Sequence, residues 1–152
     1  MKVVESGEIN MLMGEFSHGM DKKNRIIIPS KLRDGLGENF VMTKGLDSCL
    51  YIYPMAEWKT FQGKLKALPL TDKDVRSFVR FMVSGANEME PDKMGRVLIP
   101  QSLLAYAGIT GEVVSVGMMD RVEIWSKERW QEYNDSEMDM DAIALKMNEL
   151  GI

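Results

Sequence analysis

Cysteine and histidine are almost absent from this chain. Among its 152 residues there is one cysteine, Cys49, and one histidine, His18. A single cysteine excludes an intramolecular disulfide framework and fits a reducing compartment, so we expect Cys49 to be a buried or half-buried thiol. We expect His18 to lie in a turn. Since no phosphate-binding loop, dinucleotide fingerprint or zinc-ligand spacing is present either, the sequence predicts no enzyme, with no catalytic residues, metal, cofactor or small-molecule substrate.

Long hydrophobic runs are also lacking. No apolar stretch approaches the roughly 18 residues that a membrane-spanning helix needs, and the N-terminus has no apolar signal-peptide core. These absences favour a cytoplasmic protein without a membrane partner. We expect residues 1–12 to be an N-terminal extension, and residues 1–10 are left out of the fold prediction because they lie outside the repeat described next.

The chain contains one motif twice. Residues 21–29 read Asp-Lys-Lys-Asn-Arg-Ile-Ile-Ile-Pro, and residues 92–100, which begin 71 positions later, read Asp-Lys-Met-Gly-Arg-Val-Leu-Ile-Pro. The flanks also correspond, because residues 45–58 resemble residues 117–130. An internal repeat of this length indicates a duplicated supersecondary unit, so residues that recur in both copies carry more weight than residues that occur once.

Each copy of the motif predicts a turn that leads into a short strand. The aliphatic runs 26–28 and 97–99 are closed by Pro29 and Pro100, which cannot donate to a strand ladder. Asn24 and Gly95 are residue types that tolerate the positive φ of a tight turn. A short helix should follow each proline, and then a hairpin, with strands at residues 40–43, 50–53, 113–116 and 122–125.

Helical periodicity occurs between and after the two units. Apolar residues at 58, 61, 65 and 68 predict an amphipathic helix between Pro54 and Pro69, and Thr71 with Asp74 resembles a capping box for a second helix. Ser126 can cap a third helix. We expect these stripes to be mainly packing surfaces, with part of them forming an oligomer interface. The predicted organisation is unit 1 at 13–57, a helical connector at 58–84, unit 2 at 85–129 and a helical acidic C-terminal segment at 130–152.

The net charge of −4 argues at first against nucleic acid, because it repels phosphate at long range. However, residues 135–152 carry five acidic residues against one lysine, so the rest of the chain is neutral. Residues 21–34 carry five cations against two aspartates, a local charge of +3. This cluster is either a nucleic-acid-binding face or a solvated loop.

The paired arginines favour DNA binding. A guanidinium can bridge O6 and N7 of guanine or hold a phosphate through two hydrogen bonds, and the aspartate four residues earlier can fix its rotamer. We therefore predict that the DNA contacts are made by Arg25 and Arg96, oriented by Asp21 and Asp92, with phosphate contacts from Lys22, Lys23 and Lys93. The alternative is that each aspartate and arginine form only an ion pair that holds the turn.

The doubled Asp-x-x-x-Arg-x-x-x-Pro motif has further landmarks around it: Gly-Glu-Phe at 14–16, Leu-Asp at 46–47, Leu-Tyr-Ile-Tyr-Pro at 50–54 and Glu-Ile-Trp-Ser at 123–126. Together they resemble the MraZ family. The resemblance implies an α+β fold with a mostly β core, built from two AbrB-like swapped-hairpin (double-psi-like) barrel units with connecting and C-terminal amphipathic helices.

The resemblance also implies a function. It implies a bacterial, nucleoid-associated transcriptional regulator that binds double-stranded promoter DNA and represses its own division and cell-wall operon as a ring-like homo-oligomer on repeated boxes. The alternative is an AbrB-like oligomeric scaffold, or an antitoxin-type protein whose main partner is another protein.

The chain departs from the family pattern at position 104. Leu104 stands where the family commonly has a second arginine equivalent to Arg33. Arg33 is either a phosphate contact or a structural residue, and we favour the structural role. The subunit number, the operator, the direction of regulation and the role of the acidic segment stay open; that segment is either a short helix that folds on a neighbour or disordered.

Overall fold

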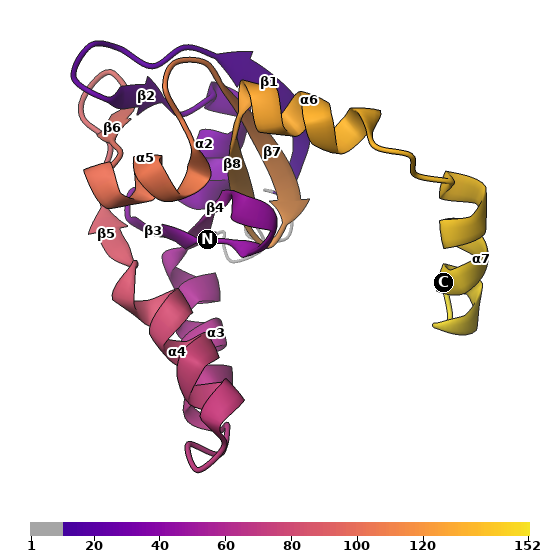
Figure 1. Ribbon diagram of the computed structural model, residues 1–152. Helices are drawn as coiled ribbons and strands as arrows, with labels where there is room; N and C mark the ends of the chain where they lie inside the picture. Colours follow the sequence, from indigo (N-terminus) through magenta and orange to yellow (C-terminus); the bar gives the residue numbers. More distant parts are fainter. Residues whose placement is uncertain (1–10) are drawn as a thin grey trace, which may run out of the picture.

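The computed structural model describes residues 11–152, which form two antiparallel sheets with short helices, a projecting helical hairpin and two C-terminal helices (Figure 1). Of the predicted extension at residues 1–12, residues 1–10 lie outside the described residues, and Leu12 begins strand β1. Within the described part, no helix is both long enough and apolar enough to cross a membrane. In chain order the elements are β1 (Leu12–His18), β2 (Arg25–Ile27), α2 (Ser30–Leu36), β3 (Phe40–Lys44), η1 (Leu46–Ser48), β4 (Leu50–Pro54), α3 (Met55–Lys66), α4 (Lys73–Ser84), β5 (Asn87–Met89), β6 (Arg96–Leu98), α5 (Gln101–Ala107), β7 (Val113–Met119), β8 (Val122–Ser126), α6 (Lys127–Asp135) and α7 (Met140–Glu149).

The strands form two antiparallel sheets in which the two halves of the chain exchange strands. The larger sheet has the order β1-β7-β8-β4-β3-β5, and β2 pairs with β6 in the smaller one. Thus β1 from the first half lies beside β7 from the second, while β5 from the second half lies beside β3 from the first. In the repeat, β1 corresponds to β5, β3 to β7 and β4 to β8. Replacing each strand by its equivalent gives the same strand order read from the other edge of the sheet. The chain therefore has an internal pseudo-twofold axis between β4 and β8.

Sequence signals account for most of these elements. Pro29 and Pro100 stand directly before α2 and α5 with φ near −55°, a value suited to the start of a helix, so each ends an extended segment and begins a helix. Ser126 caps α6 by accepting a hydrogen bond from the Arg129 backbone N–H at 3.1 Å, as predicted. The predicted α+β class with a mostly sheet core is confirmed. Within residues 11–152 the six-stranded sheet is open rather than closed into a barrel, and the strand exchange is consistent with a swapped-hairpin fold.

The main hydrophobic core lies between the two halves. It joins Ile26, Ile28 and Leu32 of the first half to Val97 and Leu103 of the second, all buried. Because equivalent aliphatic residues from both motifs meet here, neither half has a complete core of its own. A second cluster, rich in aromatic residues, packs α3, α4 and α6 against the outer side of β4 and β8.

Three details of the secondary-structure prediction were wrong. The N-cap of α4 is Asp72, whose carboxylate accepts from the Asp74 and Val75 backbone N–H groups, and not Thr71. His18 ends strand β1 and is not in a turn, because β1 continues along β7 to its pair with Val113. Strands β1 and β5 were not predicted, since their partners come from the other half of the chain.

Candidate nucleic-acid interface

The first motif forms a tight turn organised by Asp21. One carboxylate oxygen of Asp21 accepts from the Lys23 and Arg25 backbone N–H groups at 2.9 and 3.0 Å, and the other accepts from Arg25 Nε at 2.8 Å. The Asp21 N–H donates to the Arg25 carbonyl at 2.9 Å. Asn24 takes the positive φ of 62° that the turn requires. The aspartate therefore fixes both the backbone of the turn and the direction of the arginine side chain.

The second motif repeats this geometry. Asp92 accepts from the Met94 and Arg96 backbone N–H groups at 2.9 Å each, and from Arg96 Nε at 2.8 Å. Gly95 has a φ of 80° at the position of Asn24. The backbone N–H groups of Arg25 and Arg96, followed by further hydrogen bonds and the guanidinium charges, hold the pKa of the Asp21 and Asp92 carboxyls below their ordinary values. The carboxylates are thus charged at neutral pH and both ion pairs persist there.

The two turns open onto one ribbon. Strands β2 and β6 pair in the register Arg25 with Leu98, Ile26 with Val97 and Ile27 with Arg96. Successive strand residues point to opposite faces, so Ile26 and Val97 enter the core while both arginines share the other face with Ile27 and Leu98. These two aliphatic side chains are 48% and 56% exposed. The ribbon therefore presents two arginines and two aliphatic residues to the outside.

The arginines keep part of their hydrogen-bonding capacity free. Each uses Nε for its aspartate, and within residues 11–152 no hydrogen bond or ion pair engages the terminal nitrogens of Arg25 or Arg96. Lys22, Lys23 and Lys93 are exposed on the same turns. The structure thus brings together the residues that the sequence predicted for one site. The free guanidinium N–H groups can donate to a ligand that presents paired acceptor oxygens or nitrogens.

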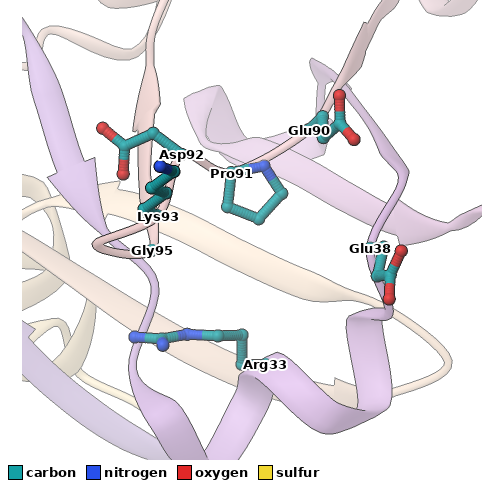
Figure 2. Close-up of a pocket in the computed structure, with 7 residues that line it drawn as sticks. All are labelled: Arg33, Glu38, Glu90, Pro91, Asp92, Lys93 and Gly95. Carbon is teal, nitrogen blue, oxygen red and sulfur yellow. The ribbon is translucent and has the colours of Figure 1, made fainter.

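Arg33 lies beneath the second turn although it belongs to the first half. Its Nη2 donates to the Ile28 carbonyl at 2.9 Å, and a Cβ added to Gly95 would lie only 2.5 Å from that nitrogen. Figure 2 shows its guanidinium end below the turn, in a surface pocket of about 320 Å³ that Lys93 also lines. Among the described residues, Arg33 forms no ion pair with an acidic side chain. Its hydrogen bond to the Ile28 carbonyl is the contact that would give it the structural role favoured above.

Leu104, the repeat equivalent of Arg33, is buried and lines a pocket with Asn24 of the first turn. Each turn is therefore backed by the helix of the other half, and the two backings differ in charge. Aligning the two repeats showed that Leu104 replaces Arg33 in the second copy. It did not show that each residue lies beside the turn of the other half, because that depends on the exchange of strands.

The only cysteine and the only histidine of the sequence, Cys49 and His18, both lie in the folded interior or at its edge. Cys49 is fully buried, and burial, followed by the negative charges of Glu123 and Asp47, raises the pKa of its thiol, so the thiolate is disfavoured. His18 is half-buried, its Nε2 lies 2.7 Å from Ser115 Oγ, and burial lowers its pKa. In the described part of the chain, no group of three or more histidine, cysteine or acidic side chains is arranged to hold a metal ion.

The fold and the site define a class: a pseudo-symmetric α+β protein of the swapped-hairpin type that displays a doubled arginine turn. Comparison with known proteins finds the same duplication of the chain. The family model described as "MraZ protein, putative antitoxin-like" matches residues 11–81 and again residues 82–149.

Curated relatives match over their whole length. "Transcriptional regulator MraZ" of Clostridium beijerinckii is 64% identical over 142 residues, which cover 93% of this chain and 100% of the relative. The protein of the same name from Clostridium tetani is 62% identical with the same coverage. That of Acetivibrio thermocellus is 53% identical over 143 residues, again 93% of this chain and 100% of the relative.

The chain belongs to the MraZ family, whose members are named as transcriptional regulators and not as enzymes. The predicted family and the predicted role in transcription regulation are thereby confirmed. The residues assigned to DNA contact stay predictions, and so do the boundaries of the predicted domains.

Proposed function

We propose that the protein is a sequence-specific DNA-binding regulator that represses its own division and cell-wall operon. It acts as a ring-like homo-oligomer on repeated promoter boxes, at the nucleoid in the bacterial cytoplasm. The observation that carries DNA binding is the exposed face of the β2–β6 ribbon, with its two fixed arginines. The major groove of B-form DNA admits a two-stranded β-ribbon, so this face is suited to contact base edges there.

Pre-organisation makes Arg25 and Arg96 suited to reading bases. Because Nε is held by an aspartate at 2.8 Å in each turn, the guanidinium loses little freedom on binding. The two free terminal nitrogens can bridge O6 and N7 of guanine. Ile27 and Leu98, exposed beside them, can contact the methyl group of thymine, the apolar feature of the same groove.

The lysines supply affinity without sequence information. Lys22, Lys23 and Lys93 lie on the exposed turns, where they can neutralise phosphates. Residues 21–25 carry three cations against one aspartate, while residues 92–96 carry two against one. Arg33 beneath the second turn adds one positive charge there, so both turns present a similar field to the DNA backbone.

Oligomerisation supplies what a single ribbon lacks. Within its described part, one chain presents one β2–β6 ribbon and therefore few base contacts. A ring that places successive ribbons on adjacent boxes converts each later contact into an intramolecular step, which raises the overall affinity through effective concentration. DNA that follows such a ring has to bend if the boxes recur with the helical repeat.

The test is fluorescence anisotropy with the DNA upstream of this gene and with a scrambled duplex, over a salt series. A bidentate arginine contributes about 1–3 kcal/mol of base discrimination. The variant with Arg25→Ala and Arg96→Ala should therefore bind the promoter at least about 30-fold more weakly, since each 1.4 kcal/mol is tenfold. The backbone N–H groups of residues 25 and 96 still donate to the aspartates in this variant, so the turns should remain folded, which circular dichroism checks.

The matched control is Arg25→Lys with Arg96→Lys. It keeps the charge and removes the planar fork, so it should retain salt-dependent binding to both duplexes and lose the preference for the promoter. If the alanine variant binds as the wild type does, the arginines only hold the turns and the assembly has another partner, as in a scaffold or an antitoxin.

A further inference from the structure

Helix α7 (Met140–Glu149) is formed but packs against almost nothing among residues 11–152 of its own chain. Asp139 caps it by accepting from the Ala142 backbone N–H at 3.2 Å, and every residue of the helix is exposed except the half-buried Met147. In Figure 1 it stands apart from the body of the molecule, beyond the end of α6. An isolated helix of ten residues is marginal in water and depends on packing for its stability. The helix therefore lacks the surface that would complete it.

The apolar residues of α7 form one stripe. Met140, Ile143, Ala144 and Met147 follow the spacing i, i+3, i+4 and i+7, which places them on one face of the helix. Leu145 lies off this stripe and is exposed. This spacing of anchors is typical of a helix that lies in an apolar groove.

A groove of the required kind runs along the hairpin of α3 and α4. It has a volume of about 230 Å³ and is lined by Gln62, Leu65, Lys66, Leu70, Val79 and Val83. Leu70 and Val83 are 60% and 42% exposed. The hairpin projects from the sheets on a different side of the molecule from α7 (Figure 1), so the helix and the groove of one chain do not meet.

The α3–α4 hairpin and the C-terminal segment that contains α7 carry opposite net charges. Residues 55–84 carry six cations against three acidic residues, a net charge of +3. Residues 135–152 carry five acidic residues against one lysine, a net charge of −4. Opposite fields steer association and set the orientation of the partners. The hairpin thus offers both an apolar groove and the complementary charge.

We propose that α7 of one copy docks in the α3–α4 groove of a second copy. The contact is heterologous, because two different surfaces meet, and repeating it around an axis generates a ring when the rotation closes. This inference rests on the oligomeric part of the proposed function, for which it supplies the joint. It does not depend on which residues read DNA.

Disulfide trapping tests the joint directly in full-length protein. Two proteins are made, one with Ile143→Cys and one with Val83→Cys, and they are mixed and oxidised; the buried Cys49 is left in place. A cross-linked dimer from the mixture, absent from either protein alone, supports the proposal. A chain carrying both substitutions that cross-links only within itself would mean that α7 folds back on its own hairpin and would overturn it, as would no cross-link at all.

Sedimentation measures the consequence for assembly. Ile143→Asp with Met147→Asp should shift the wild-type oligomer to a smaller species. The control Ala142→Asp with Leu145→Asp adds the same charge on the opposite face of the helix and should leave the assembly intact. A stripe variant that sediments as the wild type does would overturn the proposal.

The same variants separate this inference from the proposed function. The stripe variant should still bind a duplex with a single box as the wild type does, and lose only the gain from repeated boxes. The Arg25→Ala and Arg96→Ala variant should bind the promoter at least about 30-fold more weakly and keep its oligomer. If the oligomer survives the stripe substitutions, the proposed docking of α7 is wrong and the proposal of DNA binding is unaffected. If the arginine variant binds DNA as the wild type does, the proposed base contacts are wrong and the docking of α7 is unaffected.

Discussion

Replacing Gly95 with alanine should destabilise the protein through two separate effects. Gly95 has a φ of 80° and is buried, and a Cβ there would lie 2.5 Å from Arg33 Nη2. The left-handed backbone costs a residue with a Cβ about 1–2 kcal/mol. Moving Arg33 out of the way breaks its 2.9 Å hydrogen bond to the Ile28 carbonyl, and a bond to a charged group contributes about 1.5–3 kcal/mol.

The expected loss is the sum of the two effects, about 2.5–5 kcal/mol in the free energy of unfolding. For a chain of this size that lowers the melting temperature by at least about 5 °C. Thermal and urea unfolding followed by circular dichroism, at one fixed protein concentration because the assembly state also affects stability, would measure it.

The repeat provides the control. Asn24→Ala changes the equivalent turn, which also has a positive φ of 62° but already contains a Cβ, so it should cost only about 1 kcal/mol. In an Arg33→Leu background, which copies the Leu104 arrangement, the cost of Gly95→Ala should fall to the backbone part alone, about 1–2 kcal/mol. A cost that stays the same with and without Arg33 would refute the placement of this arginine beneath the second turn.

Two further predictions concern the fold. Burial holds the pKa of His18 below its ordinary value of 6.5, so the unfolded chain takes up this proton first and stability falls as the pH drops through 6.5; His18→Gln should therefore differ less from wild type at pH 5 than at pH 8 in urea unfolding, and an unchanged difference would contradict this. A fragment of residues 11–81 lacks the strands that pair with β1 and β2; it should not form a folded monomer by circular dichroism and sedimentation, and a stable monomeric fragment would show that the exchange of strands is dispensable.

Local signals in the sequence predicted most of the fold. Pro29 and Pro100 marked the starts of α2 and α5, and Ser126 marked the start of α6, because such residues act on the backbone beside them. The doubled motif predicted two equivalent turns, and their hydrogen bonds agree to within about 0.1 Å. Information of this kind is contained in a few neighbouring residues.

What the sequence did not predict depends on residues far apart in the chain. Strands β1 and β5 are short or contain polar residues, and their pairing is decided by β7 and β3 of the opposite half. For the same reason, the support of Gly95 by Arg33 was not visible in the repeat, which aligns Arg33 with Leu104 and not with the turn it touches. The cap of α4 was misplaced by one residue, since Thr71 and Asp72 are both good capping residues and only the backbone decides between them.

The exchange of strands gives a single chain the symmetry of a dimer without requiring its halves to be identical. In a homodimer one substitution changes both reading turns at once, and the two-fold axis favours palindromic sites. Here Lys23 in the first repeat corresponds to Met94 in the second, and Arg33 corresponds to Leu104, so the two turns have diverged independently. Under the proposed function, each ribbon has a direction, and a row of such ribbons would follow boxes repeated head to tail along one strand.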